Sequence, residues 1–251
     1  MSLPDSPKGV ISALRDAGSV VALTGSGISA ESGVPTFREA QTGLWERYDP
    51  QELATPEAFA RDPRLVWEWY EWRRNLVAKA EPNPGHRAFA ELERRIPNFT
   101  LETQNVDGLH ERAGSRNVVE VHGNILRSKC SLEDEVIQPE EHDDSIPPRC
   151  ARCDAFLRPD VVWFGEMLPA GALEAASEAA RECDLFFSIG TSGLVYPAAA
   201  LPFEALENGA TLVEINPNET PLTPYADCSL RGLAGEVLPT VLREAFHPKG
   251  G

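Results

Sequence analysis

The 251-residue sequence has few basic residues, no long apolar run and only five cysteines. Its 23 basic residues face 39 acidic ones, and the net charge of −16 opposes nonspecific adhesion to nucleic acids and anionic membranes. Prolines and charges interrupt the N-terminal region where a secretory signal needs an apolar core, and no later run is long enough to span a membrane. We therefore expect a cytoplasmic protein without a membrane or nucleic-acid partner, whose acidic surface attracts lysine-rich protein segments.

The cysteines argue against a disulfide framework, because their number is odd. Cys150 and Cys153 form a C-x-x-C pair, which suits a reducing compartment and a metal site better than disulfides. Internal repeats and long low-complexity linkers are also missing. With 42% apolar residues, the chain can bury one large core, or a large core with a small satellite.

Apolar strand-like runs alternate with helical stretches, which predicts an α/β fold with a mostly parallel sheet covered on both faces. The expected strands are residues 20–24, 99–103, 118–121, 161–164, 185–189 and 211–215. The expected helices are residues 7–17, 63–79, 84–95, 170–182, 197–207 and 235–246. Ser6, Asp62 and Asn83 are expected to cap three helices that begin with proline.

Two stretches interrupt this alternation. Residues 37–80 are predicted to be helical and are rich in aromatic side chains, whereas residues 123–159 carry three of the five cysteines and two acidic runs. We expect both stretches to be insertions that pair into a second, smaller domain.

The segment 24–38, TGSGISAESGVPTFR, follows an apolar strand and contains three glycines and three serines. Gly25 and Gly27 allow a tight turn and a close approach to a pyrophosphate, and the segment satisfies the loose dinucleotide fingerprint G-x-G-x-x-G/A. A strand-to-helix turn without a ligand is an equally acceptable interpretation. A dehydrogenase is disfavoured, because residues 37–50 lack the apolar strand that would end in a ribose-binding acidic residue.

Two further strand ends carry polar side chains. Gln104, Asn105 and Asp107 follow the second expected strand, where they can orient a ligand or simply cap a helix. His122 follows the third expected strand, and a histidine suits a general base near neutral pH. Because three polar strand ends converge, we favour a catalytic site over purely structural roles.

Six spaced motifs make the chain resemble the sirtuins, a family of NAD-dependent protein-lysine deacylases. The matching segments are GSGISAESGVPTFR at 25–38, TQNVDGLHERAG at 103–114, VHGN at 121–124, LRPDVVWFGE at 157–166, GTSGLVYPA at 190–198 and INP at 215–217. They occur in the order of the family and run through nearly the whole chain. The resemblance implies a Rossmann-like large domain of residues 1–36, 81–122 and 160–251. It also implies a smaller domain made of a helical module, residues 37–80, and a zinc-ribbon-like module, residues 123–159.

The resemblance further implies that NAD is the co-substrate. Segment 25–38 would hold the pyrophosphate and nicotinamide side, with Phe37 over the reacting ribose, and the TQNVD motif would position the nicotinamide ribose and amide. The implied NAD-binding residues are Gly25, Ser26, Gly27, Ile28, Ser29, Ala30, Phe37, Arg38, Gln104, Asn105, Val106, Asp107, Gly190, Thr191, Ser192, Asn216, Pro217, Asn218 and Ala234.

In the reaction of the family, the acyl oxygen of the substrate lysine attacks the nicotinamide ribose, nicotinamide leaves, and the acyl group ends on ADP-ribose. Asn105 and His122 would be the catalytic residues, with His122 as the base on the ribose hydroxyls. The acyl-lysine peptide would lie extended between residues 161–166 and 193–196, adding a strand by backbone pairing. The implied substrate-binding residues are Tyr70, Arg73, His122, Val162, Trp163, Phe164, Gly165, Gly193 and Val195.

Tyr70 and Arg73 lie three residues apart, so on a helix they share a face. A guanidinium and a phenol can together grip a carboxylate with charge-assisted hydrogen bonds. The same Tyr-x-x-Arg pair marks the sirtuin class that removes succinyl and malonyl groups, in which bacterial members often keep deacetylase activity. The alternative is that Tyr70 packs on the neighbouring tryptophans while Arg73 pairs with a glutamate or water.

The metal site departs from the family pattern. Sirtuins usually hold a structural zinc with two C-x-x-C pairs, whereas here Cys130 is followed three residues later by Glu133. The implied metal ligands are Cys130, Cys150 and Cys153. The fourth position would fall to an oxygen or nitrogen ligand such as Glu133, Asp134 or His142, and loss of zinc is the alternative.

We therefore predict an NAD-dependent deacylase that acts on acetylated and on succinylated or malonylated proteins. Mono-ADP-ribosyl transfer on the same scaffold and a non-catalytic NAD-sensing interaction module are the alternatives. His122 together with Asn105 argues against a sensor, which needs no base. The sequence leaves the protein substrates and the oligomeric state open, a monomer included.

Overall fold

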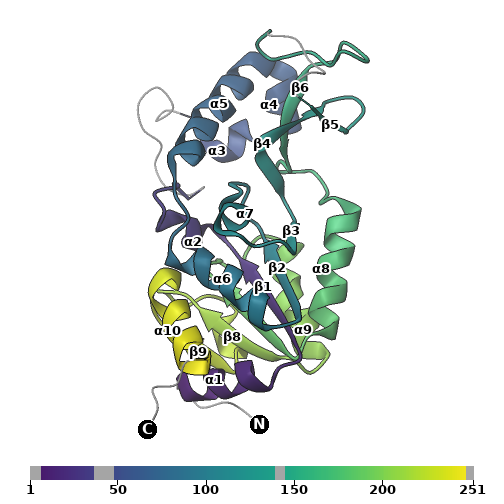
Figure 1. The fold of residues 1–251 in the computed structure, drawn as a ribbon. Helices are drawn as coiled ribbons and strands as arrows, with labels where there is room; N and C mark the ends of the chain where they lie inside the picture. Colours follow the sequence, from purple (N-terminus) through teal and green to yellow (C-terminus); the bar gives the residue numbers. More distant parts are fainter. Residues whose placement is uncertain (1–6, 37–47, 139–144, 247–251) are drawn as a thin grey trace.

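The computed structural model describes residues 7–36, 48–138 and 145–246, which are built around a six-stranded sheet (Figure 1). The strand order is β3-β2-β1-β7-β8-β9, and all neighbours run parallel. The strands are β1 (Ser19–Thr24), β2 (Asn98–Thr103), β3 (Val118–Glu120), β7 (Leu185–Ile189), β8 (Thr211–Ile215) and β9 (Cys228–Leu230). β9 is not among the expected strands, because three residues with a central serine form no apolar run.

Helices cover both faces of this sheet, which confirms the predicted α/β, Rossmann-like class (Figure 1). The helices are α1 (Pro7–Asp16), α6 (Pro84–Arg95) and α10 (Ala234–Phe246) on one face, and α8 (Ala170–Glu182) and α9 (Leu201–Glu207) on the other. Residues of β1 alternate between the two cores, because successive side chains of a strand point to opposite faces. Val20 belongs to the first core and Val21 to the second.

Asp62 and Asn83 cap helices as predicted. The Asp62 carboxylate accepts a backbone N–H in the first turn of α5 (Pro63–Lys79), and the Asn83 side chain does so at the start of α6. Ser6 lies outside the described residues. The helix expected from residue 197 begins instead as a 3-10 turn, Ala198–Ala200, that leads into α9.

A second, smaller unit combines helices with a three-stranded antiparallel sheet of order β5-β4-β6 (Figure 1). Its helices are α3 (Pro50–Leu53), α4 (Pro56–Arg61) and α5, and its strands are β4 (Gly123–Cys130), β5 (Val136–Ile137) and β6 (Leu157–Val161). Trp69 of α5 shares one apolar core with Ile125 of β4 and Val161 of β6. The two insertions therefore pack together, and we propose residues 37–80 and 123–159 as their bounds.

The strand expected at residues 161–164 is wrong. β6 ends at Val161 and pairs antiparallel with β4 instead of joining the parallel sheet. The backbone then turns, because the N–H of Trp163 donates to the Glu166 carboxylate and that of Phe164 donates to a carbonyl at the end of α3. This apolar run therefore lines the space between the two units rather than the inside of a sheet.

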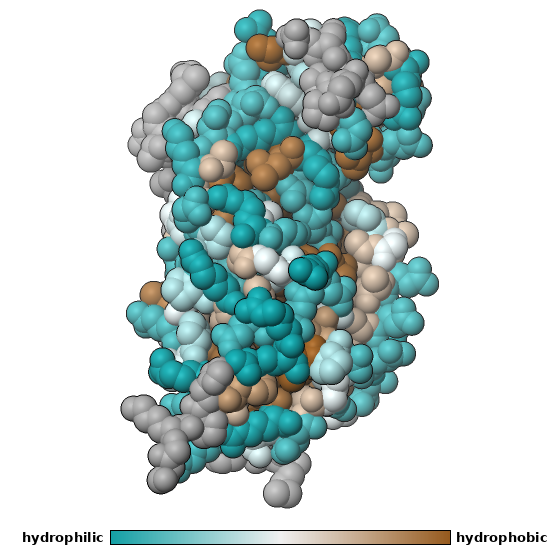
Figure 2. Space-filling view, viewed as in Figure 1, coloured by the Kyte–Doolittle hydropathy of each residue, from teal (hydrophilic) through white to brown (hydrophobic). Residues whose placement is uncertain are grey.

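The described surface is mostly polar (Figure 2), and the cysteines are free thiols. The face drawn in Figure 2 is largely hydrophilic, with apolar side chains in small patches. All five cysteines lie in the described part of the chain, and none of them forms a disulfide. Within the described ranges, no helix combines the length and apolar character needed to cross a bilayer.

Glu102 places a carboxyl group in the middle of the parallel sheet. Its side chain is fully buried on β2, and neither carboxyl oxygen has a hydrogen-bond partner among the described residues. Burial, with a smaller contribution from Glu204, raises the pKa of Glu102 well above that of a free glutamate. The folded state therefore favours the protonated Glu102 carboxyl group. The folded protein loses stability as the pH rises above the pKa that this carboxyl group has in the unfolded chain.

We expect Glu102→Val to raise the melting temperature at pH 8, because an unpartnered buried polar group costs about 1–3 kcal/mol. The gain in melting temperature should be smaller at pH 5, because at that pH it costs less free energy to keep the buried Glu102 carboxyl group protonated. Thermal unfolding of both proteins at the two pH values measures this. Glu174→Val on the exposed side of α8 is the control and should give no gain. A Glu102→Val effect that is equal at both pH values would contradict the account.

Candidate active site

A cleft of about 670 Å³ opens where the carboxyl ends of β1, β2, β7 and β8 face the small unit. β1 lies between β2 and β7, so the order of connections reverses at this point of the sheet. The loops diverge at such a reversal and leave a crevice in which α/β proteins bind ligands. The volume lies in the range of small-molecule and cofactor sites.

Gly27 and Gly190 make a close backbone contact at the floor of this cleft. The Gly27 N–H donates to the Gly190 carbonyl at 2.8 Å, and a Cβ on Gly27 would lie 2.7 Å from that oxygen. Gly190 has a φ of +60°, which favours glycine, and a Cβ there would lie 2.7 Å from the backbone nitrogen of Ile28. The turn into the short helix α2 (Ser26–Ala30) can reach β7 only because these positions lack side chains.

Asn105 and Asp107 are held in place by a short hydrogen-bond chain. Asn105 Nδ2 donates to the Gly25 carbonyl and to Ser29 Oγ, both at 3.0 Å. Both N–H donors of the side-chain amide are thereby used, so a ligand could interact with its oxygen, which is an acceptor. Ser29 Oγ donates to Asp107 Oδ2 at 2.7 Å, and the Leu109 N–H donates to Asp107 Oδ1 at 2.9 Å. Burial raises the pKa of Asp107, and these two hydrogen bonds partly offset the rise.

His122 has the protonation state of a general base. Its Nδ1 lies 3.0 Å from the Gln104 carbonyl oxygen, which can only accept, so the proton of the neutral ring is on Nδ1 and Nε2 stays basic. Burial lowers the pKa of His122, and the contact with Gln104 offsets part of that change. The ring is therefore neutral at physiological pH.

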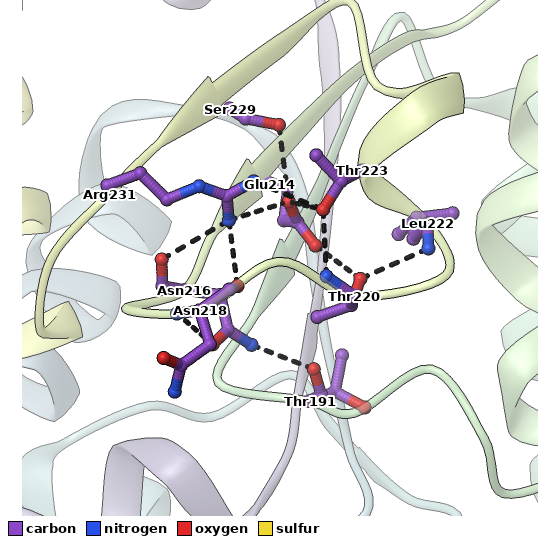
Figure 3. A network of polar contacts seen from close by, with 9 residues as sticks. All are labelled: Thr191, Glu214, Asn216, Asn218, Thr220, Leu222, Thr223, Ser229 and Arg231. Atoms are coloured by element: carbon purple, nitrogen blue, oxygen red, sulfur yellow. Dashed lines mark hydrogen bonds and ion pairs between the residues drawn. The ribbon is translucent and has the colours of Figure 1, made fainter.

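Glu214 anchors the loop that follows β8 (Figure 3). Its buried carboxylate accepts hydrogen bonds from Arg231 and from three hydroxyl groups, those of Thr220, Thr223 and Ser229. Arg231 also donates to the carbonyl of Asn218 at 2.8 Å, and Asn216 Nδ2 donates to the Thr191 carbonyl at 2.9 Å. Sequence reasoning missed Glu214 and Arg231, although a glutamate inside the apolar strand T-L-V-E-I was an available signal.

Most of the predicted NAD-binding residues line the cleft. They are Gly25, Ser26, Gly27, Ser29, Gln104, Asn105, Val106, Asp107, Gly190, Thr191, Ser192, Asn216, Pro217, Asn218 and Ala234. Ile28 and Ala30 are not among the lining residues, and Ile28 is fully buried in the large core. Phe37 and Arg38 lie outside the described residues. Sequence reasoning did not select Glu219 and Leu233, which also line the cleft.

Most of the predicted substrate-binding residues also line the cleft. Those that line it are Tyr70, Arg73, His122, Val162, Trp163, Phe164, Gly165 and Val195, whereas Gly193 does not. Burial raises the pKa of Tyr70 to about 12 and lowers the pKa of Arg73. An anionic ligand beside Arg73 would relieve this penalty on its charge. Tyr70 also packs edge-on against Trp69, with 4.6 Å between ring centroids, so packing and cleft lining coexist.

Four potential metal ligands meet in the small unit. The ligand atoms of Cys130, Glu133, Cys150 and Cys153 all lie within 4.8 Å of one another, and the Cys130 and Cys153 sulfurs are 3.4 Å apart. The backbone N–H of Glu133 donates to the Cys130 sulfur. Three thiolates and one carboxylate at this spacing fit a tetrahedral structural zinc, so the residues present suit the metal that the family pattern implies.

The fold and the cleft define an α/β protein with a glycine-lined crevice at the carboxyl ends of its parallel strands and a neutral histidine in that crevice. The chain belongs to the Sir2 family, whose model matches residues 25–197. It is 54% identical over 235 residues to an NAD-dependent protein deacylase of Aquifex aeolicus (strain VF5), covering 92% of this chain and 98% of that protein.

Two solved structures extend the comparison. A crystal structure of a Sir2 homologue in complex with NAD superposes with a TM-score of 0.88 at 50% identity, covering 95% of this chain and 93% of the other. A Sir2 protein bound to an acetylated peptide gives a TM-score of 0.85 at 31% identity, with coverage of 95% and 98%. The resemblance to the sirtuin family and the predicted fold are thereby confirmed.

We expect the protein purified without chelator to contain about one zinc ion per chain, because the cluster offers four ligands. Glu133→Ala should weaken zinc binding by at least the roughly 10- to 100-fold that loss of an outer-shell partner costs, and Glu133→Cys should strengthen it. Competition with a chromophoric chelator measures the affinities.

Asp134→Ala is the matched control for this experiment. Asp134 pairs with Lys129 at 2.6 Å and is not part of the ligand cluster, so its loss should leave zinc affinity near that of the wild type. His142, the third candidate for the fourth position, lies outside the described residues. A protein that contains no zinc, or a Glu133→Ala variant with unchanged affinity, would show that the proposed ligand set is wrong.

Proposed function

We propose that this chain is an NAD-dependent protein-lysine deacylase that transfers the acyl group to ADP-ribose and releases nicotinamide. The observation that carries the proposal is the neutral His122, hydrogen-bonded to the residue before Asn105, in a cleft floored by glycines. The 54% identity to an NAD-dependent protein deacylase and the similarity to a Sir2–NAD complex support it.

We assign the groups of NAD to the loops of the parallel sheet. The pyrophosphate would lie against the backbone of Gly25 and Gly27, where the absence of side chains permits close approach. The nicotinamide ribose would lie beside Asn105, and the adenosine end would lie near Asn216 and Ala234. These loops are joined by hydrogen bonds to one another, so the co-substrate would meet a site whose polar groups are already oriented.

The reaction then needs orientation more than a strong nucleophile. The carbonyl oxygen of the acyl-lysine would attack C1′ of the nicotinamide ribose, the C1′–N bond to the cationic nicotinamide ring would break, and nicotinamide would leave as a neutral molecule. Holding the two reactants in line converts this into an effectively unimolecular step. Nε2 of His122 would accept the proton of a ribose hydroxyl, and water would complete the release of free lysine and O-acyl-ADP-ribose.

The acylated protein segment would enter between residues 161–166 and 193–196. Phe164, Leu194 and Tyr196 expose 44%, 54% and 69% of their area there, which offers apolar contact to a bound peptide. Acyl-lysine proteins as partners are further supported by the similarity to a Sir2 protein bound to an acetylated peptide. The free thiols of the chain suit a reducing compartment, and we propose the cytoplasm as its location.

We further propose that the acyl groups removed include succinyl and malonyl as well as acetyl. Tyr70 and Arg73 line the same cleft as His122, at the end where the acyl chain would lie. Arginine stays protonated in proteins, and its fork of donors matches a carboxylate. A dicarboxylic acyl tail would therefore receive donors from both side chains, whereas an acetyl group is too short to use them.

Arg73→Met tests the acyl preference. Two charge-assisted hydrogen bonds are worth about 1.5–3 kcal/mol each, so kcat/KM for a succinyl-lysine peptide should fall about 100-fold or more, and for the matched acetyl-lysine peptide far less. NAD-dependent nicotinamide release with both peptides measures this. Arg64→Met, on the exposed start of the same helix, is the control. An equal loss with both peptides would assign Arg73 a structural role only.

His122→Ala tests the base. Turnover should fall by roughly 100- to 10,000-fold, while NAD binding measured by calorimetry stays close to that of the wild type. Because burial lowers the pKa of His122, wild-type kcat/KM should stay level as the pH falls from 8, and it should drop only at a pH lower than that at which a free histidine becomes protonated. A His122→Ala variant with wild-type turnover would rule out the assigned role.

A further inference from the structure

Trp163 lines the cleft and also donates a directed hydrogen bond to Tyr70. Its Nε1–H donates to the hydroxyl oxygen of Tyr70 at 2.9 Å, and its side chain is only 2% exposed. An indole N–H is a donor only, so the phenol oxygen must be the acceptor. The single proton of the Tyr70 hydroxyl is therefore directed away from Trp163, and Tyr70 itself lines the cleft.

The indole of Trp163 is itself fixed from two sides. The Arg158 guanidinium lies 3.4 Å from the centroid of its ring, and Phe59 packs at 5.3 Å between centroids. Arg158 is 7% exposed and donates through both terminal nitrogens to the Glu166 carboxylate. Glu166 in turn accepts the backbone N–H of Trp163 at 2.8 Å. The backbone and the ring of Trp163 are thus both held by the same ion pair, in which Arg158 is buried and Glu166 is partly buried.

The hydrogen bond from Trp163 restricts the direction of the Tyr70 O–H. A phenol that nothing holds can rotate its O–H freely and gains little selectivity from it. With Trp163 occupying one lone pair, the Tyr70 hydroxyl keeps its donor for a group in the cleft, and its pKa of about 12 keeps the proton bound over the working pH range. A carboxylate at that place would accept this donor together with Arg73, whereas a methyl group would leave it unused.

We propose that Trp163 is a positioning residue for acyl selectivity: its indole N–H orients the Tyr70 hydroxyl toward the carboxylate of a dicarboxylic acyl-lysine. This inference rests on the proposed desuccinylase activity. It adds a third residue, with Arg158 and Glu166 as its support, to the pair that contacts the acyl tail.

Trp163→Phe, which keeps a ring and removes the donor, tests the inference with succinyl- and acetyl-lysine peptides. We expect KM for the succinyl peptide to rise roughly tenfold, the cost of about one hydrogen bond, with smaller changes in kcat and in KM for the acetyl peptide. Tyr70→Phe should give a similar selective loss. In the double variant the two losses should not add, because both act through one hydroxyl.

The experiment distinguishes failure of the proposed desuccinylase activity from failure of the role proposed for Trp163. If the wild type does not turn over succinyl-lysine, the proposed desuccinylase activity fails and the inference fails with it. If the wild type does so and Arg73→Met loses it, but Trp163→Phe lowers both activities equally or adds fully to Tyr70→Phe, only the role of Trp163 is refuted. Should Trp163→Phe not fold, Arg158→Lys removes the planar group over the indole and should cause a weaker loss of the same selectivity.

Discussion

The backbone contact between the turn after β1 and the end of β7 is the constraint on which the rest of the cleft depends. Gly27 and Gly190 approach so closely that a Cβ on either would overlap the backbone of the other strand's loop. This approach brings the Gly25 carbonyl within reach of Asn105, and it brings Thr191 between Gln104 and Asn216. One contact without side chains therefore connects the loops of four parallel strands.

The other polar groups of the site are kept in place by hydrogen bonds to one another. The Gln104 carbonyl selects the tautomer of His122, and Ser29 links Asn105 to Asp107. Such groups are costly to bury singly but rigid when paired, so they present fixed donors and acceptors to a ligand. In the proposed reaction, the loops of the parallel sheet would bind the nucleotide and supply His122 as the base. The small unit would supply Tyr70 to the acyl group.

Local signals in the sequence were sufficient for five of the six strands of the parallel sheet, for the long helices and for two of their caps, because these depend on residues close in the chain. Asp62 and Asn83 cap the predicted helices. The apolar run at 161–164 was misread as a strand, since an apolar run can line a cleft as well as a sheet. Glu214 and Arg231 were missed because their ion pair joins β8 to the residue after β9, a pairing that spacing does not reveal.

Some parts of the candidate site could likewise be predicted from local sequence signals, whereas others could not. The glycine turn, the polar strand ends and His122 as a candidate base were recognisable from the residues alone. NAD and the action of His122 on the ribose hydroxyls followed from the likeness of six motifs to one family. The fourth metal ligand was left among three candidates, and the ligand cluster of the described residues contains Glu133 because its turn returns it to Cys130. The approach of Glu133 to the cysteine cluster depends on the three-dimensional fold, which the spacing of the residues in the sequence does not specify.

The most direct test of the account is product analysis. The protein, NAD and an acyl-lysine peptide are incubated together, and nicotinamide, deacylated peptide and O-acyl-ADP-ribose are quantified by mass spectrometry. The account predicts equal amounts of all three, formed only when the acylated peptide is present. ADP-ribose attached to protein, or nicotinamide release that does not depend on the acyl group, would contradict a deacylase and indicate ADP-ribosyl transfer or simple NAD hydrolysis instead.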